Sequence, residues 1–351
     1  MSATNGGSTR PVVITGGAGF IGSNLAHRLL QGGERVILFD DLSRPLVARN
    51  VEWLRRSHGD RVELCEADVR DAAAVDEACR GASFVVHLAA QVAVTTSLRD
   101  PIEDFEINAR GTLNVLEAIR RQPSPPPLVF TSTNKVYGAL PDVALRERGL
   151  RCEPEDAAVR GRGISEARAL DFHSPYGCSK GAADQYVLDY ARTFGLSAAV
   201  LRMSCIYGVR QLGSEEQGWV AHFAIQALRG APITVYGDGL QVRDVLFIDD
   251  LVSAVLAARA ALPEIRGRAF NLGGGPEQTT SLLEVIDLLQ EIGGRCTELR
   301  FEAARTGDQR WYVSDLQRFK DATGWAPSVR LRDGVARLCA FLRDTGIGVA
   351  A

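Results

Sequence analysis

Short apolar runs alternate with helical patterns through the first two thirds of the chain. Each run is long enough for one strand, and helices are expected between them at about 71–80, 103–121 and 178–194. The expected strands are residues 12–14, 35–40, 62–65, 84–88, 128–131 and 198–201. Because strands that alternate with helices pair in parallel, the pattern predicts an α/β fold with a doubly wound parallel sheet of the Rossmann type.

The pattern changes beyond about residue 204, where the elements become shorter and less regular. Strands are expected at 233–236 and 242–246, and helices at about 218–230, 249–261, 281–293 and 331–344. We interpret this part as a smaller α+β lobe over the carboxyl ends of the sheet, where such folds bind ligands. The predicted division is a Rossmann domain of residues 1–204, with 241–271 returning to it, and a lobe of residues 205–240 and 272–351. Residues 139–172 are charged and lack a sustained apolar period, so we expect them to form a flap beside the functional site.

A glycine-rich turn follows the first expected strand. Gly16 or Gly17 permits the tight turn, Gly19 lets backbone amides approach a pyrophosphate, and Gly22 lets the next helix pack against the strand. The N-terminus of that helix directs free amides at the phosphates. The spacing therefore predicts a dinucleotide-binding turn.

Asp40 ends the second expected strand at the separation typical of ribose recognition. Its carboxylate can accept hydrogen bonds from both hydroxyls of the adenosine ribose and repels a 2′-phosphate. The predicted cofactor is therefore NAD rather than NADP, although Arg44 lies close enough in sequence to weaken the preference.

Tyr176 and Lys180 lie four residues apart on an expected helix, so they share one face. An ammonium beside a phenol favours the phenolate and is expected to lower the pKa of Tyr176 from its usual value of roughly 10. A phenol tuned in this way can take a proton from an alcohol while hydride leaves the same carbon. This spacing alone is common on solvated helices. It indicates a catalytic pair here because a dinucleotide-binding glycine turn lies upstream in the same chain.

Composition narrows the function classes. The chain has 351 residues, is 46% hydrophobic and carries a net charge of −3, so it offers no basic stripe for nucleic acid. No apolar stretch is long enough for a membrane span and no signal peptide is visible, so a cytoplasmic location is expected. The seven scattered cysteines are expected to be reduced thiols, and no metal site is expected from the histidine and cysteine spacing.

Motifs spread along nearly the whole chain resemble the extended short-chain dehydrogenase/reductase family. They are Thr15-Gly-Gly-Ala-Gly-Phe-Ile-Gly22, His87-Leu-Ala-Ala90, Thr131-Ser-Thr133, Tyr176 with Lys180, Tyr236-Gly-Asp-Gly-Leu-Gln-Val-Arg-Asp244 and Asn271-Leu-Gly. The resemblance implies that Thr133 completes a catalytic set with Tyr176 and Lys180, holding the sugar hydroxyl that is oxidised. It also implies that the first domain binds NAD and that the lobe binds a nucleotide sugar.

The resemblance assigns further residues to the two ligands. The residues expected at the cofactor are Gly16, Gly19, Phe20, Ile21, Gly22, Asp40, Asp41, Ser43, Arg44, Asp68, Val69, Leu88, Ala89, Ala90, Asn108, Thr131, Tyr176, Lys180 and Met203. The residues expected at the substrate are Asn134, Ser204, Cys205, Gln217, Val220, Tyr236, Arg243, Arg305 and Asp308. Of these, Arg243 and Arg305 are expected at the diphosphate, since guanidinium presents a fork to phosphate oxygens.

The residues after Thr133 distinguish chemistries within the family. Dehydratases of this family carry an Asp-Glu pair there, whereas this chain has Asn134 and Lys135. Neither an amide nor an ammonium can serve as the carboxylate base of an elimination, so redox chemistry without dehydration is expected. Decarboxylation is disfavoured for the same reason.

The segments 131–138, 172–187, 202–208 and 217–223 are most similar to the branch that inverts C2 of CDP-hexoses. The resemblance therefore implies an NAD-dependent epimerase that acts through a transient 2-keto sugar. Alternatives are a UDP-hexose 4-epimerase, an oxidoreductase reducing a 4-keto sugar, and a cofactor-sensing regulator without chemistry. The family also implies a homo-oligomer, dimer or tetramer, joined through the helices at about 103–121 and 178–194.

Overall fold

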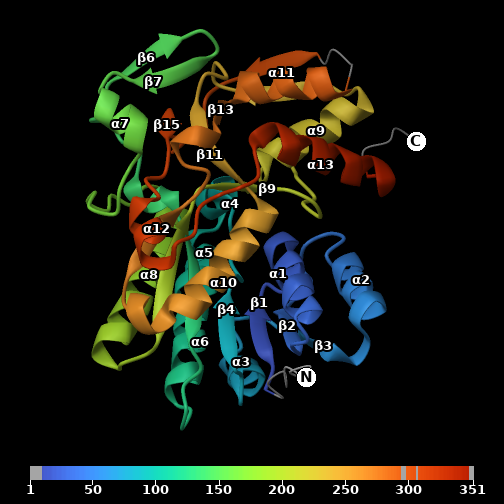
Figure 1. Cartoon of the computed structure of the whole chain (residues 1–351), viewed down its shortest axis with the longest axis vertical. Helices are drawn as coiled ribbons and strands as arrows, with labels where there is room; N and C mark the ends of the chain where they lie inside the picture. Colours follow the sequence, from blue (N-terminus) through green and yellow to red (C-terminus); the bar gives the residue numbers. More distant parts are fainter. Residues whose placement is uncertain (1–9, 294–297, 306, 348–351) are drawn as a thin grey trace, which may run out of the picture.

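A parallel sheet of seven strands forms the centre of the protein in this computed structural model, which describes residues 10–293, 298–305 and 307–347 (Figure 1). Its strand order is β12-β8-β5-β4-β1-β2-β3, so the order reverses beside β1 and opens a ligand crevice there. The strands are β1 (Val12–Thr15), β2 (Val36–Asp40), β3 (Val62–Glu66), β4 (Phe84–His87), β5 (Leu128–Thr133), β8 (Ala198–Met203) and β12 (Ala269–Leu272). The expected doubly wound α/β fold is confirmed, and β12 joins the sheet from beyond residue 204.

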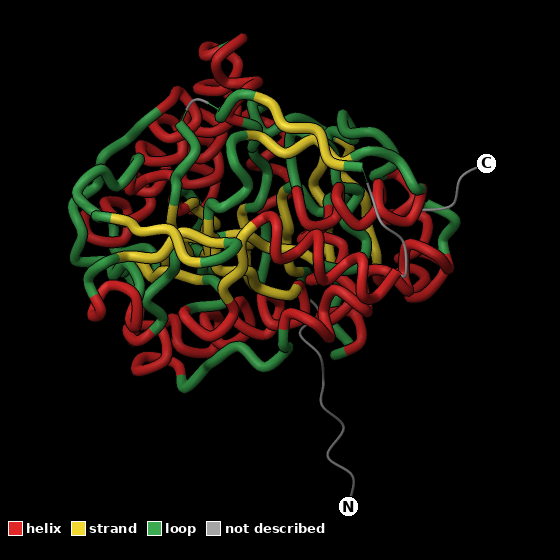
Figure 2. Tube along the Cα trace, turned by 90° about the horizontal axis from the view of Figure 1, so that it is seen from above, coloured by secondary structure: helices red, strands yellow, loops and turns green. Residues whose placement is uncertain are grey.

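Helices cover both faces of this sheet (Figures 1 and 2). One face carries α1 (Phe20–Gln31), α2 (Ala48–His58), α10 (Ile248–Ile265) and α12 (Gln317–Thr323). The other carries α3 (Ala72–Cys79), α6 (Gly111–Arg120) and α8 (Ser174–Thr193). The chain reaches α6 through α4 (Val94–Arg99), α5 (Pro101–Phe105) and a π-helical turn (Glu106–Arg110), and 3-10 turns occur at Gly59–Arg61, Asn134–Tyr137 and Pro276–Gln278.

Alternate side chains of the central strands enter the two cores. Val12 and Ile14 point into the core under α1 and α10, whereas Val13 points into the core under α3 and α6. Because both faces are buried, the central strands consist almost entirely of apolar residues, and this is what made them visible in the sequence.

A smaller lobe caps the carboxyl end of β5. Its strands are β9 (Cys205–Tyr207), β10 (Ile233–Tyr236), β11 (Val242–Phe247), β13 (Thr279–Ser281), β14 (Leu299–Glu302) and β15 (Trp311–Tyr312). Its helices are α9 (Trp219–Arg229), α11 (Leu282–Gly293) and α13 (Leu331–Asp344). Strand β11 pairs with β9, β13 and β15, and β10 pairs with β14. Gln309 of the lobe accepts a hydrogen bond from Asn134, just after β5, at 3.1 Å.

The expected flap at 139–172 is more regular than its sequence suggested. It contains β6 (Leu145–Arg148), β7 (Arg151–Pro154) and α7 (Ala157–Arg162), and the hairpin projects from the lobe (Figure 1). Arg151 donates to Glu284 of α11 at 2.6 Å, and the amide of Cys152 donates to the carbonyl of Leu240 at 2.8 Å. These contacts attach the hairpin to the lobe, and the role of residues 139–172 as a flap stays a prediction.

Candidate active site

The turn between β1 and α1 forms a cradle of backbone at the carboxyl end of the sheet. Gly16 has a φ of +68°, a left-handed conformation that favours glycine. A Cβ added at Gly16 would lie 2.9 Å from the amide nitrogen of Ala89, and one added at Gly22 would lie 2.3 Å from the carbonyl oxygen of Gly16. Helix α1 begins after Gly19 without a side-chain cap, so its first N–H groups are available to an anion. The cradle therefore fits the pyrophosphate of a dinucleotide.

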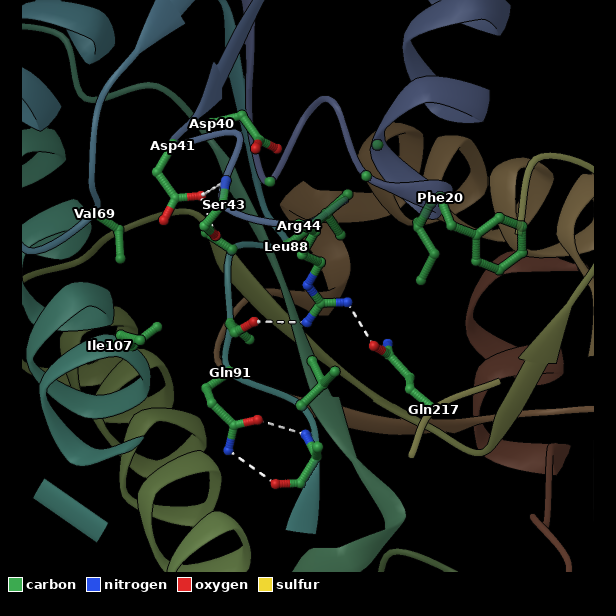
Figure 3. A pocket seen from close by; sticks show the side chains of 18 of the residues that line it. Phe20, Asp40, Asp41, Ser43, Arg44, Val69, Leu88, Gln91, Ile107 and Gln217 are labelled. Atoms are coloured by element: carbon green, nitrogen blue, oxygen red, sulfur yellow. Dashed lines mark hydrogen bonds between the residues drawn. The ribbon is translucent and has the colours of Figure 1, made fainter. Parts of the chain in front are cut away.

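A cavity of about 470 Å³ opens beside this cradle (Figure 3). Nearly all residues expected at the cofactor line it: Gly16, Gly19, Phe20, Ile21, Gly22, Asp40, Asp41, Ser43, Arg44, Asp68, Val69, Leu88, Ala89, Ala90, Thr131, Tyr176, Lys180 and Met203. Asn108 is the exception, because its Oδ1 accepts from the amide of Gln91 and its Nδ2 donates to the Gln91 carbonyl, both at 3.0 Å. Asn108 therefore supports a wall of the cavity rather than forming it. Gln91, which does line the cavity, follows the motif ending at Ala90 and was missed.

Asp40 lies at the edge of the cavity, at the end of β2. Its carboxylate accepts from the amide of Ala18 at 2.9 Å and from the amide of Leu42 at 3.0 Å. Burial raises the pKa of Asp40, although these hydrogen bonds oppose that change. A carboxylate has about four acceptor sites, so it can still receive the two ribose hydroxyls.

Arg44 extends across the mouth of the cavity (Figure 3). Its Nη1 donates to Oε1 of Gln217 at 2.5 Å, and its Nη2 donates to the carbonyl of Ala90 at 3.4 Å. Gln217 was expected at the substrate, but it lines the cofactor cavity. The pair therefore joins the lobe to the Rossmann unit across the cavity.

The three residues expected to be catalytic meet where β5 ends and α8 begins. The Thr133 hydroxyl donates to Oδ1 of Asn134 at 3.3 Å, and by favouring the ionised phenol it partly opposes the rise that burial causes in the pKa of Tyr176. Lys180, one turn along α8, donates from Nζ to the carbonyl of Thr131 at 2.7 Å and lies 4.2 Å from the ring centre of Phe130. The side chains of Thr133, Tyr176 and Lys180 are all buried, so water screens charges there only weakly.

The pKa values of this group differ from the expectation. Burial raises the pKa of Tyr176 to about 12, and the Thr133 hydroxyl and the charge of Arg44 only partly oppose this. Burial also lowers the pKa of Lys180 to about 7, against the attraction of Asp184 and Asp104. The expected lowering of the Tyr176 pKa by Lys180 is therefore wrong for the protein alone, because spacing on a helix does not reveal how far both groups are removed from water.

A buried polar network that the sequence did not suggest supports the start of α8. Asp104 of α5 is fully buried and accepts from the hydroxyl of Ser179 at 2.5 Å and from Gln91 at 2.7 Å. Asn108 donates to both Asp104 and Ser179 at 3.1 Å. Asp104 and Ser179 are 75 positions apart in the chain. Ser179 lies within segment 172–187, but Asp104 belongs to no motif, so no sequence signal joined them.

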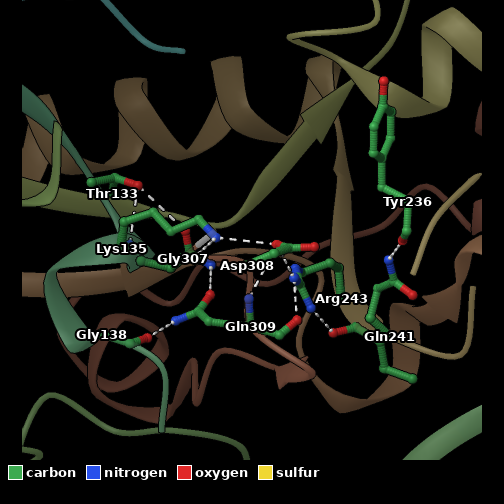
Figure 4. A network of polar contacts seen from close by, with 11 residues as sticks. Thr133, Lys135, Gly138, Tyr236, Gln241, Arg243, Gly307, Asp308 and Gln309 are labelled. Atoms are coloured by element: carbon green, nitrogen blue, oxygen red, sulfur yellow. Dashed lines mark hydrogen bonds and ion pairs between the residues drawn. The ribbon is translucent and has the colours of Figure 1, made fainter. Parts of the chain in front are cut away.

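On the lobe side, Lys135 and Arg243 share one carboxylate (Figure 4). Asp308 Oδ1 accepts from Arg243 Nη2 at 2.6 Å and from Lys135 Nζ at 3.3 Å. Burial would raise the pKa of Asp308, but the two cations lower it to about 2. Asn134 lies next to this group and donates to Gln309. Burial raises the pKa of the Cys205 thiol, and the charges of Arg243 and Lys135 oppose that change.

The remaining residues expected at the substrate are more dispersed. The guanidinium of Arg305 lies 3.9 Å from the ring centre of Tyr236, whose hydroxyl contacts Glu215. Ser204 donates to the carboxylate of Asp244 at 2.5 Å, and Val220 is buried in α9. Arg243, Asp308, Asn134 and Cys205 thus form one cluster, while Tyr236 and Arg305 form a separate pair.

Neither a metal-binding cluster nor a membrane-spanning helix occurs in residues 10–293, 298–305 and 307–347. Within those ranges, no group of three or more His, Cys, Asp or Glu side chains is arranged to hold a metal ion. None of the helices in them has both the length and the apolar character needed to cross a membrane.

Comparison with known proteins places this geometry in a family. Residues 12–273 match the NAD dependent epimerase/dehydratase family. The chain is 44% identical to CDP-paratose 2-epimerase of Salmonella typhi, over 93% of this chain and 97% of that protein. Two crystal structures of UDP-glucose 4-epimerases resemble the fold. The Thermotoga maritima structure, with UDP-glucose, has a TM-score of 0.82 at 31% identity. The Thermus thermophilus structure, with NAD, has a TM-score of 0.79 at 32% identity. Each match covers 95% of this chain and 99% of the matched chain. The chain therefore belongs to the NAD dependent epimerase/dehydratase family.

Proposed function

We propose that the protein inverts C2 of a CDP-hexose, in a reaction of the CDP-paratose to CDP-tyvelose type. The observation that carries the proposal is the 44% identity to CDP-paratose 2-epimerase over nearly the full length of both chains. The loop after β5 supports it, because Asn134 and Lys135 stand where dehydratases of this family carry carboxylates.

The chemistry follows from the carbon that must be inverted. The hydrogen on C2 of such a sugar is not acidic, so direct proton abstraction would leave a carbanion without stabilisation. Oxidation to a 2-keto sugar, exposure of the other face of the ketone and reduction avoid that problem. NAD, when bound, supplies a hydride acceptor that is restored within each turnover.

We assign the binding of NAD to the glycine cradle, Asp40 and the cavity beside them. The glycines leave no side chain between the backbone amides of the cradle and the pyrophosphate. Asp40 accepts hydrogen bonds from the ribose hydroxyls. The contact of Arg44 with Gln217 closes over the cavity and limits the access of water. The proposed division of labour gives the cofactor to residues 1–204 with 241–271, and the nucleotide sugar to residues 205–240 and 272–351. The exception is Arg243 of β11, which pairs with the lobe and is assigned to the nucleotide sugar.

The catalytic side chains then have distinct roles. Thr133 orients the C2 hydroxyl, with its own hydroxyl beside Tyr176. Tyr176 has a pKa of about 12 in the protein alone, so its phenolate would have to be stabilised by the positive charge of bound NAD. In that form it would take the proton of the C2 hydroxyl and return it when the ketone is reduced. Lys180 stands behind the phenol with a pKa of about 7, so it can exchange a proton near neutral pH.

A UDP-hexose 4-epimerase remains the second candidate, because the structure closely matches that of the Thermotoga maritima enzyme with UDP-glucose. A net oxidoreductase would need a cofactor that exchanges with solvent, and the Arg44 contact with Gln217 across the cavity disfavours exchange.

Proton NMR of the purified protein in deuterated water tests the proposal. CDP-paratose, CDP-glucose and UDP-glucose are supplied separately, and the configuration at C2 and C4 is read from the coupling constants. Inversion at C2 of a CDP-sugar without uptake of deuterium is the expected result. Inversion at C4 of UDP-glucose, or deuterium at the inverted carbon, would refute it.

We also propose that a second copy of the chain docks on α4, α5 and α8. Leu98, Ile102 and Phe105 are 49%, 75% and 51% exposed there, and Tyr186 of α8 is 46% exposed. Exposed apolar side chains on adjacent helices are typical of a subunit interface. Light scattering after gel filtration should give twice or four times the mass of one chain.

A further inference from the structure

Lysine is rare in this chain and is concentrated at one place. Lys135, Lys180 and Lys320 are the three lysines among 40 basic residues, and the others are arginines. Lys320 is exposed on α12, whereas Lys135 and Lys180 both lie at the candidate active site. An ammonium is a compact charge with three rotatable donors, in contrast to the planar fork of arginine. The role of Lys180 is already assigned, so Lys135 requires an explanation of its own.

Lys135 connects the catalytic hydroxyl to the cation cluster of the lobe. Its backbone amide donates to Oγ1 of Thr133 at 3.2 Å. Its ammonium donates to the carbonyl of Gly307 at 3.2 Å and to Asp308 at 3.3 Å, and its side chain is 20% exposed (Figure 4). Lys135 therefore contacts the Thr133 hydroxyl through its backbone amide and the Asp308 carboxylate through its ammonium.

The charge of the cluster suits a diphosphate. Arg243 and Lys135 share the ionised carboxylate of Asp308, and Arg305 lies three residues earlier on the same segment. The cluster of Lys135, Arg243 and Asp308 carries one net positive charge, and Arg305, which pairs with Tyr236, adds a second cation from the same segment as Asp308. Together they match the two negative charges of the diphosphate in a nucleotide sugar. Burial and Arg243 lower the pKa of Lys135, while Asp308 raises it, so an added anion would stabilise the ammonium.

The position of the phosphate depends on which sugar carbon reacts. In a glycosyl diphosphate, C1 carries the phosphate oxygen and C2 is the next carbon, so only three bonds separate C2 from phosphorus. C4 lies across the ring, and a C4-epimerase must hold the phosphate farther from its catalytic hydroxyl. A cation two residues after Thr133 is therefore placed for reaction at C2.

We propose that the Lys135 ammonium binds the phosphate attached to the sugar and so places C2, rather than C4, at Thr133 and Tyr176. This inference rests on the proposed function and identifies a residue that sets its regiochemistry. The phosphate on the nucleoside side is left to Arg243 and Arg305.

Calorimetric titration of the NAD-loaded enzyme with CDP and CMP tests the contact. CMP lacks the phosphate that Lys135 would bind, and CDP contains it. Lys135→Gln should lower the affinity for CDP by about 10- to 100-fold, the range for a charged hydrogen bond, and change that for CMP by less than about twofold. Lys135→Arg keeps the charge and should lie between Lys135→Gln and the wild type. Lys320→Gln, a matched change on exposed α12, should leave both affinities unchanged.

The outcomes separate this inference from the proposed function. Unchanged affinity for CDP in Lys135→Gln would overturn it. So would an equal loss for CDP and CMP, which would indicate structural damage instead of a lost phosphate contact. The site of epimerisation is read independently by NMR of the wild type. If the wild type inverts C4, the proposed function and the C2 placement fail, while the CDP and CMP comparison still decides whether Lys135 contacts the phosphate.

Discussion

At the junction of β5 and α8, a phenol, a hydroxyl and an amine share a volume that excludes water. The hydroxyl of Thr133 favours the ionised form of Tyr176, which lines the cofactor cavity together with Lys180. Tyr176→Phe should therefore lower kcat by about 10²- to 10⁴-fold, the range for a lost general acid and base, without releasing NAD. Turnover is followed by NMR, and bound NAD by absorbance after denaturation.

Tyr186→Phe is the matched control for that change, because Tyr186 lies on the same helix and is 46% exposed. It should keep the wild-type kcat. Near-normal turnover in Tyr176→Phe, or loss of NAD from it, would contradict the assigned role.

Lys180 provides a prediction about pH and stability. Its pKa falls from the ordinary 10.5 to about 7 in the folded protein, chiefly through burial. Between these values the unfolded chain binds more protons at this site than the folded chain, so the contribution of Lys180 to stability rises as the pH increases from about 7 to about 10. The wild type should therefore gain in Tm relative to Lys180→Met over that interval.

Thermal melts of the two proteins across the interval measure this difference. Lys320→Met serves as the control, since Lys320 is an exposed lysine on α12, outside the buried site. A difference between wild type and Lys180→Met that stays constant with pH would show that the amine is not held near neutrality.

At the scale of elements, the contact of α1 with the cradle is too close for any side chain. A Cβ at Gly22 would lie 2.6 Å from Cα of Gly17 as well as 2.3 Å from the Gly16 carbonyl. Gly22→Ala should therefore displace α1, lower the free energy of unfolding by about 1–3 kcal/mol and reduce the amount of bound NAD. Denaturant titration and NAD content measure the two effects.

Gly161 of α7 offers a comparison, because a Cβ there meets nothing within 4 Å. Gly161→Ala should stabilise the protein by about 0.5–1 kcal/mol, since alanine loses less freedom in a helix. If Gly22→Ala matched Gly161→Ala in both measurements, the close packing of α1 would not matter for the cofactor.

Most of the strongly buried strands were predicted from the sequence, although β12, which is buried at all four positions, was missed. Strands β1, β4 and β5 are apolar on both faces, so their runs stood out. Strand β14, by contrast, has mostly exposed side chains and is defined by pairing with β10, and β15 has two residues. Such strands depend on distant partners and leave little periodicity of their own.

At the scale of the whole molecule, contacts between distant segments limited what could be predicted. The glycine cradle and the Tyr176–Lys180 pair were predicted because each is local. The contact between Lys135 and Asp308 joins residues 173 positions apart, and it forms only when the lobe lies over the end of β5. The pKa of Tyr176 was predicted in the wrong direction for the same reason, since its burial comes from the assembled protein.

The two parts of the molecule are also joined over the cofactor cavity, and this contact is expected to control how long NAD stays bound. Arg44 reaches Gln217, and the hydroxyl of Thr95 contacts Glu216, so both contacts fasten the loop before α9 to the Rossmann unit. Arg44→Met removes one of them and should increase the rate of NAD loss during dialysis by about tenfold or more. Arg49→Met, an exposed change on α2, should lose NAD at the wild-type rate.

The sequence suggested another role for Arg44, which is to tolerate the 2′-phosphate of NADP, and the same variant distinguishes the two. If Arg44 closes the cavity, Arg44→Met loses NAD faster, and so does Gln217→Ala, which removes the partner from the opposite side. If Arg44 serves the 2′-phosphate, Arg44→Met weakens only NADP binding and Gln217→Ala has no effect on either cofactor. The 2.5 Å contact favours closure, because the guanidinium is already bonded across the cavity to Gln217.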